Sequence, residues 1–334
     1  MSEEKKIDFI DNPDFNRWIE ENYKVEIEEY EYQSSDVLYK INYDDYLDAL
    51  KRYNADPKIE LTRIEDNFPS PIAYYFSQAN NNYQNDHHRL DLLKSCWESI
   101  VFFLYGLVVA EARHRKIPLN SLGNRWDKYW SDKIFDKLTI IENIIDYTTK
   151  NGLKFDCSVL VPVATLSKIK SLNQERNGFE HSAARTSAQQ MDLYKTLCPL
   201  LENVLKELIN LEKVTVLRYY SSEIPLVPRC EIFNGSSLEG HKDNIILKKD
   251  NYIEILDHFN ASSIFAKIGD EVFCLSPFIH FSQELHETNA TLCFFKKEKS
   301  GKYLFEVVSK AKDIEFDKSN FSLIENKLKA LVVP

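Results

Sequence analysis

The sequence predicts an α+β protein in three parts: an acidic N-terminal appendage, a central helical bundle and a C-terminal, mostly antiparallel β-rich domain. Three observations predict this order. Acidic residues gather at the start of the chain, apolar residues repeat with helical spacing through its middle, and short β-rich runs separated by turn residues fill its end. The expected boundaries are residues 1–66, 67–213 and 214–334. A chain of 334 residues suffices for two ordinary domains.

The N-terminal segment carries the net charge of the whole chain. Residues 1–66 hold 19 Asp and Glu against 9 Lys and Arg, whereas the remainder holds 33 of each, and the net charge is −10. The run Val25–Tyr32 (VEIEEYEY) alternates apolar and acidic side chains, as a solvated edge strand or hairpin does. Acidic surfaces repel phosphate backbones. The objection to a nucleic-acid partner is therefore weaker for residues 67–334 than for the chain as a whole.

Four to five helices are expected between residues 67 and 213. Leu90–Arg115 repeats apolar residues every three or four positions, the spacing of a helix stripe, and Pro118 and Gly123 are expected to end this helix. Helices of this number predict a bundle. The others are expected at Ser131–Thr149, at Val163–Asn173, and at Gln189–Lys213 with Ser187 and Gln190 as its capping box.

After Lys213 the pattern changes to short β-rich runs. Gly269-Asp270 and Ser300-Gly301 have the composition of two-residue hairpin turns, which favours antiparallel pairing. Phe321–Leu331 is expected to form a closing helix, and Cys274–Phe281 a strand that leads into a turn at Pro277. The runs are Val214–Tyr220, Arg229–Phe233, Ile245–Lys248, Ile264–Ile268, Glu271–Leu275, Thr291–Lys296 and Tyr303–Val308.

Compartment and cofactors are predicted from what the chain lacks. The first fifteen residues are charged where a signal peptide needs an apolar run, and Ile100–Ala110 is about half the length of a membrane span. The six cysteines form no C-x-x-C pair, which is typical of reduced thiols. P-loop, dinucleotide-binding, hydrolase and zinc-protease motifs are absent. We expect a cytoplasmic protein with no membrane contact, no cofactor and no metal.

One motif has chemical content: Arg176-Asn177-Gly178-Phe179-Glu180-His181, between the third and last long helices. It resembles the motif of the HEPN (higher eukaryotes and prokaryotes nucleotide-binding) family, whose helical bundles carry an Arg, usually followed by a polar residue such as Asn, and a His after four to six intervening residues. The resemblance covers about residues 69–213. The β-rich segment loosely resembles the C-terminal module attached to HEPN-like helices in some bacterial defence proteins.

The resemblance implies a homodimeric endoribonuclease, a toxin or antiviral effector, whose β-rich domain binds a ligand or a partner protein. Its catalytic residues would be Arg176 and His181, supported by Asn177. The residue types suit this reaction, because an RNA phosphodiester can be cut without metal by its own 2′-OH. Histidine moves protons near neutral pH, and a guanidinium stabilises the charge that accumulates on the phosphate.

Arg176 and His181 are five positions apart, about 140° around a helix, so one helix does not easily direct both at one phosphate. Two solutions follow. The backbone can break near Gly178, which tolerates non-helical conformations. Alternatively, two copies face each other across a two-fold axis and share the site, which is the arrangement that the resemblance implies.

Other interpretations of the motif stay open. Arg176 and Glu180 have the spacing of a solvated ion pair on a helix, and His181 could simply pack. Ala183 stands where some toxin-type members of the family have Tyr, and many HEPN-like modules only bind. The alternative is therefore a non-catalytic binding or scaffold protein of a defence or toxin–antitoxin system. A regulator that binds a nucleotide in the β-rich domain is a third reading, with no motif behind it.

Basic residues lie at both ends of the long helix: His87-His88-Arg89 before it and Arg113-His114-Arg115-Lys116 after it. Either run suits an RNA backbone, and either is equally typical of a solvated helix end. The predicted RNA-binding residues are Arg113, His114, Arg115, Lys116 and Arg185, and His114 would join the active centre if its helix end lay near the motif. Residues 1–66 are expected to cover the positive cleft at Arg176 and His181, to recruit a basic partner, or to act as a solubilising segment.

Overall fold

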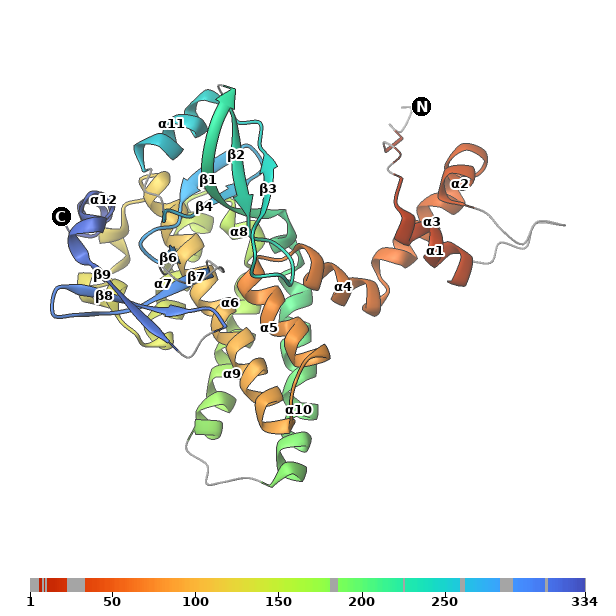
Figure 1. Ribbon diagram of the computed structural model, residues 1–334, viewed down its shortest axis with the longest axis horizontal. Coiled ribbons are helices and arrows are strands. Elements are labelled where there is room, and N and C mark those ends of the chain that lie inside the picture. Colours follow the sequence, from red (N-terminus) through yellow and green to blue (C-terminus); the bar gives the residue numbers. More distant parts are fainter. Residues whose placement is uncertain are drawn as a thin grey trace. The chain divides into compact units, whose positions relative to one another are not determined.

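The computed structural model describes residues 6–7, 9, 11–22, 34–180, 186–224, 226–258, 262–282, 291–309 and 312–333, with the backbone alone for 173–180, 223 and 291. The chain divides into two compact units, residues 1–62 and 63–334. Helices dominate its first two thirds and antiparallel sheets its last third (Figure 1), which confirms the mixed α and β class. The expected boundary between residues 213 and 214 falls inside the second unit.

The first unit is helical and has an aromatic core. It contains α1 (Pro13–Asn22), α2 (Ser35–Ile41), α3 (Tyr43–Asn54) and the start of α4 (Pro57–Asn67). Phe15, Tyr46 and Tyr53 are buried against one another, and the Trp18 indole N–H donates to Asp56 over 3.0 Å. The strand or hairpin expected at Val25–Tyr32 lies outside the described residues.

Helix α6 (Asp86–His114) is the centre of the second unit. It packs against α5 (Ser70–Asn81), α7 (Ile134–Lys150) and α10 (Ser187–Glu207), and apolar side chains cover nearly its whole circumference. Among the described helices it alone is long and apolar enough to cross a membrane, but most of it is buried inside the protein. A helix that is apolar all round belongs to a core.

Helices α8 (Cys157–Leu160) and α9 (Val163–Glu180) complete the bundle. The bounds of α6, α9 and α10 differ from expectation. α6 ends at His114, before Pro118, because the chain turns through a left-handed Lys116 with φ of 56°. The capping box of α10 uses Thr186 and Gln189, one residue earlier than expected. α9 continues to Glu180 instead of Asn173.

Two antiparallel sheets follow the helices. In the first, β1 (Val214–Ile224), β2 (Val227–Ile232), β3 (His241–Asn244), β4 (Phe265–Ile268) and β5 (Glu271–Cys274) lie in the order β3-β2-β1-β4-β5. In the second, β6 (Ile279–Ser282), β7 (Thr291–Lys299), β8 (Lys302–Val307) and β9 (Asp313–Asp317) lie in sequence order. Both predicted hairpin turns are confirmed, since Ile268 pairs with Glu271 and Lys299 with Lys302.

Some predicted β elements were wrong. The strand expected at Ile245–Lys248 is earlier, at His241–Asn244, and a helix, α11 (Lys249–Asp257), follows it. The run Cys274–Phe281 is divided between the end of β5 and the start of β6. The closing helix is confirmed as α12 (Ser322–Val332).

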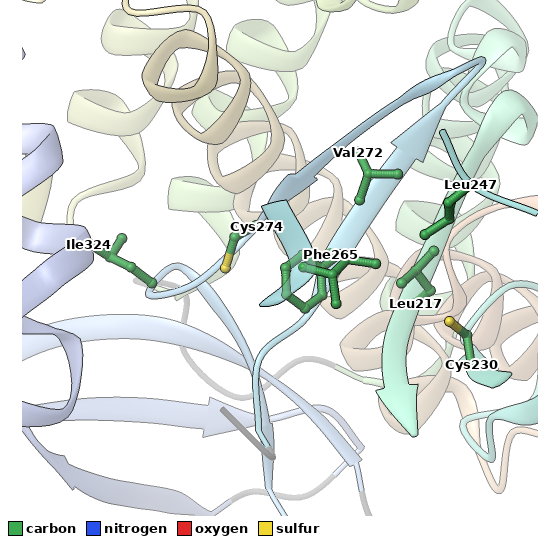
Figure 2. Packing of buried hydrophobic residues seen from close by; sticks show 8 residues of the cluster. Leu217, Cys230, Leu247, Phe265, Val272, Cys274 and Ile324 are labelled. Atoms are coloured by element: carbon green, nitrogen blue, oxygen red, sulfur yellow. The ribbon is translucent and has the colours of Figure 1, made fainter. Parts of the chain in front are cut away.

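One apolar cluster joins the first sheet to α11 and α12. Figure 2 shows Leu217 and Cys230 from β1 and β2 packed near Phe265 and Val272 from β4 and β5. Ile255 of α11 and Ile324 of α12 belong to the same cluster. This face of the sheet is therefore closed to solvent, and any ligand of the sheet must use its other face or its edges.

Candidate functional site

The Arg-Asn-x3-His motif lies at the end of α9. Arg176, Asn177 and Gly178 are in its last turns, and the helix is continuous to Glu180. The prediction of a backbone break at Gly178 is therefore wrong, because one glycine costs a helix interior only about 1 kcal/mol. His181 and Arg185 lie outside the described residues.

The end of α9 lies at one end of the helical bundle. α9 and α10 are antiparallel, because Thr165 and Lys168 near the start of α9 bind Glu207 at the end of α10. At the other end, the Ser187 hydroxyl at the start of α10 donates to Asp86 at the start of α6 over 2.6 Å. Figure 1 shows the free ends of α9 and α10 well away from the sheets. The motif therefore lies at the same end as His87-His88-Arg89.

This end of the bundle presents two histidines. His87 Nε2 is 3.4 Å from Asp91, and its Nδ1 is 3.5 Å from the amide of Gln190. His88 accepts a hydrogen bond from the backbone N–H of Gln84 through Nδ1, at 3.1 Å. Both imidazoles lie at the surface.

Arg89, the next residue in the sequence, is held by contacts within the protein. Its Nε donates to the Ala79 carbonyl over 2.9 Å. Its guanidinium lies over the rings of Tyr83 and Tyr194, at 4.2 and 3.7 Å from their centres. Such contacts fix the turn between α5 and α6.

Arg113, a predicted RNA-binding residue, is buried at 6% exposure at the opposite end of α6. Its guanidinium donates to the Ser276 carbonyl over 2.8 Å and to the Cys274 carbonyl. Burial lowers the pKa of Arg113, yet a guanidinium stays charged in proteins. The RNA-binding prediction is therefore wrong for Arg113: it supplies donors to carbonyls where β5 ends and the chain turns toward β6.

Arg115 is likewise engaged within the protein. Its Nε donates to Glu111 over 2.6 Å, and its terminal nitrogen donates to Asp156 over 2.5 Å. Glu111 is fully buried and also accepts the backbone N–H groups of Asp156 and Cys157, at 2.7 and 2.8 Å. The pair thus neutralises a buried carboxylate and holds the start of α8, and it leaves Arg115 no free face for a phosphate.

His114 lies between two carboxylates, with Glu254 at 3.7 Å and Glu271 at 3.8 Å. α6 has 29 residues and is about 43 Å long, so His114 is far from the motif end of the helix. The expectation that His114 joins the active centre is wrong. Of the run 113–116, Lys116 alone is exposed to solvent.

The bundle contains one apolar cavity that sequence reasoning did not locate. It has a volume of about 40 Å³ between α6, α9 and α10, and its walls include Leu90, Trp97, Leu172 and Leu201. Trp97 is buried, and its N–H donates to the Ile169 carbonyl over 3.3 Å. The cavity holds about one water volume, which is too little for a nucleotide.

Within the described residues no group of three or more His, Cys, Asp or Glu side chains is arranged to hold a metal ion. All six cysteines are buried, unpaired thiols. Burial raises the pKa of the Cys230 thiol to about 12, which keeps it protonated and unreactive.

Comparison with protein-family models, with curated proteins and with solved structures found no match to this chain. The assignment of the bundle to the HEPN family therefore stays a prediction, and it rests on the motif and its position.

Proposed function

We propose that the chain is a metal-independent endoribonuclease of HEPN type, acting in the cytoplasm as a toxin or antiviral effector. Arg176 and His181 are its catalytic residues, and Asn177 orients the imidazole or a phosphate oxygen. The position of the motif carries the proposal: its residues up to Glu180 occupy the last turns of α9, at the end of the bundle where α6 and α10 both begin. Residues at the end of a bundle are open to a long polymer, whereas residues at its centre are not.

The reaction needs one base, one acid and one cation. The O2′–P bond forms as a neutral His181 accepts the 2′-OH proton, and the P–O5′ bond breaks as the leaving oxygen receives a proton from an imidazolium. The products are a 2′,3′-cyclic phosphate and a 5′-OH. Arg176 stabilises the extra negative charge of the pentavalent phosphate through its guanidinium fork.

A homodimer best explains how an Arg176 guanidinium and a His181 imidazole reach the same phosphate. Because α9 is helical to Glu180, a break at Gly178 does not bring Arg176 round toward the side of His181. A second copy across a two-fold axis supplies the missing group. In that arrangement His181 of one copy accepts the 2′-OH proton and then, as the imidazolium, donates it to the leaving oxygen, beside Arg176 of the other copy.

The test is cleavage of single-stranded RNA by the purified full chain, with analysis of the product ends. We expect 2′,3′-cyclic phosphate ends, and a loss of at least about 100-fold in rate for His181→Ala and for Arg176→Ala. The exposed His241 on β3 gives the matched control, since His241→Ala should cleave like the parent. An inactive parent chain, or a fully active His181→Ala variant, would refute the enzyme.

Mixing the two inactive variants tests the shared site. A dimer of one Arg176→Ala copy and one His181→Ala copy keeps one site with both groups, because each copy supplies what the other lacks. We expect part of the activity to return on mixing. Full activity of either variant alone would contradict a shared site.

The second function is a non-catalytic HEPN-like scaffold of a defence or toxin–antitoxin system. It is favoured by the use of Arg113 and Arg115 inside the fold, which removes two cations from the predicted RNA path. A scaffold would bind its partner protein equally well with His181→Ala and would leave RNA intact.

A further inference from the structure

One face of the first sheet is uncovered over part of β1, β2 and β3. Side chains alternate between the faces of a strand, and directly paired residues share a face. Arg218 pairs with Glu231 and Glu231 with Lys242, while Ser221 pairs with Arg229 and Arg229 with Asn244. These six side chains therefore lie on one face, opposite the core of Leu217 and Cys230.

Tyr220 belongs to the same face. The register of β1 and β2 shifts between Tyr219 and Ser221, and the Lys242 ammonium lies over the Tyr220 ring at 4.1 Å from its centre. The ladder continues beyond β3, since the N–H of Leu247 donates to the Leu226 carbonyl. Leu247 packs in the core, so its neighbour Ile246 points to the open face.

The part of this face that carries Tyr220, Ile224 and Ile246 is exposed. Tyr220 is 50% exposed, Ile224 61% and Ile246 80%. Arg229 and Lys242 are also exposed, and neither forms an ion pair with a carboxylate of the described residues. The part around Arg218 is closed, because Arg218 pairs with Glu231 at 2.9 Å and its guanidinium lies over the ring of Phe281.

The exposed groups form a set suited to one kind of ligand. A half-exposed tyrosine offers a stacking surface to a base, and such stacking tolerates any base. Two cations and one amide lie on neighbouring strands about 4.8 Å apart, within reach of the phosphates on either side of a stacked base. A base face is accessible to such a ring only when the strand is unpaired.

We propose that this open face, Tyr220 with Arg229, Lys242 and Asn244, binds single-stranded RNA. A base stacks on Tyr220 and displaces the Lys242 ammonium, which then pairs with a phosphate together with Arg229. The choice of RNA as ligand rests on the proposed function. Figure 1 shows this face at the opposite end of the second unit from the free ends of α9 and α10. The face is thus a second contact for long substrates, remote from the cleavage motif.

The experiment measures fluorescence anisotropy of labelled single-stranded RNA with the full chain carrying His181→Ala, so that cleavage does not interfere. We expect Tyr220→Ala to weaken binding by about 5- to 100-fold and Tyr220→Phe to bind like the parent, because the ring is kept. The double variant Arg229→Glu with Lys242→Glu should weaken binding and reduce the slope of log affinity against log salt by about 1.4. The double variant Lys299→Glu with Lys329→Glu, at exposed positions on β7 and α12, makes the same change in charge and should alter neither the affinity nor the slope.

Unchanged affinity of both Tyr220→Ala and the double variant, with thermal unfolding like the parent, would overturn the proposal. So would unchanged RNA affinity together with loss of a protein partner, which would make the face a protein-binding surface. The nuclease proposal and the proposal of an RNA-binding face can be refuted independently of each other. With His181 intact, Tyr220→Ala should raise the KM for long RNA and leave the rate at saturation unchanged. A chain that cleaves no RNA but loses affinity on Tyr220→Ala refutes the nuclease and keeps the binding face.

Discussion

The two ends of α6 carry similar basic sequences, His87-His88-Arg89 and Arg113-His114-Arg115-Lys116, but the fold uses them differently. At the first end two imidazoles remain at the surface, beside the start of α10. At the second end two guanidiniums are enclosed and bind carbonyls and carboxylates of the protein itself. A basic run in a sequence therefore identifies an anion site only when its neighbours in space are known.

The largest expected difference between the two ends of α6 is in their contribution to the free energy of unfolding. Arg113→Met leaves the carbonyls of Cys274 and Ser276 buried without these donors, and we expect the free energy of unfolding to fall by about 3 kcal/mol. Arg89→Met at the other end loses one carbonyl contact and two ring contacts, and should cost about 1 kcal/mol. Urea unfolding of the two variants measures both values. Equal losses would contradict the contrast.

The middle of α6 offers a second measurement, through Lys137 of α7. This lysine is 1% exposed and lies among the rings of Phe102, Tyr105 and Phe295. Burial lowers its pKa from 10.5 to about 7, against the opposing effect of Asp132 and Asp136.

The direction of the pH effect follows from that shift. Between about pH 7 and 10.5 the unfolded chain binds a proton that the folded chain does not, so stability rises with pH across this window. In Lys137→Met this contribution is absent. We expect the stability of the parent relative to the variant to increase by about 3 kcal/mol from pH 7 to 10. A constant difference in chemical unfolding across these pH values would contradict the lowered pKa.

The smallest expected effect concerns RNA. His87→Glu with His88→Glu places two negative charges beside the end of α9, and we expect RNA affinity to fall about fivefold in the His181→Ala background. Lys116→Glu makes a charge change at the far end of α6 and should leave affinity unchanged. Anisotropy in low salt measures both. A larger loss for Lys116→Glu would place the RNA path at the opposite end.

Sequence reasoning succeeded where a pattern is local. The apolar stripe of α6 and the turns at Gly269 and Ser300 depend on neighbours within a few residues, and both were predicted. The last turns of α9 were missed because Phe179 is the one apolar residue after Leu172 in this helix, too few to mark a helical stripe. α11 was missed because its nine residues are too few to show a repeated apolar stripe.

The candidate site was predicted only in part, because some of its contacts join residues that are far apart in the sequence. The motif and its place near the end of a helix follow from nearby residues. The burial of Arg113 depends on Cys274 and Ser276, which are more than 160 positions away. The residues of the open sheet face come from three strands, and only the register of those strands brings Tyr220 next to Lys242.

The close approach of α6 to β6 has a consequence for folding. A Cβ atom on Gly106 would lie 2.9 Å from the Ile279 side chain, so only glycine lets the helix backbone come this near. With Arg113 bound to the carbonyls after β5, the central helix is attached to both sheets. A fragment ending at Lys213 would expose this surface of α6 and lose its acceptors. We therefore expect the helices and sheets of the second unit to unfold as one cooperative unit.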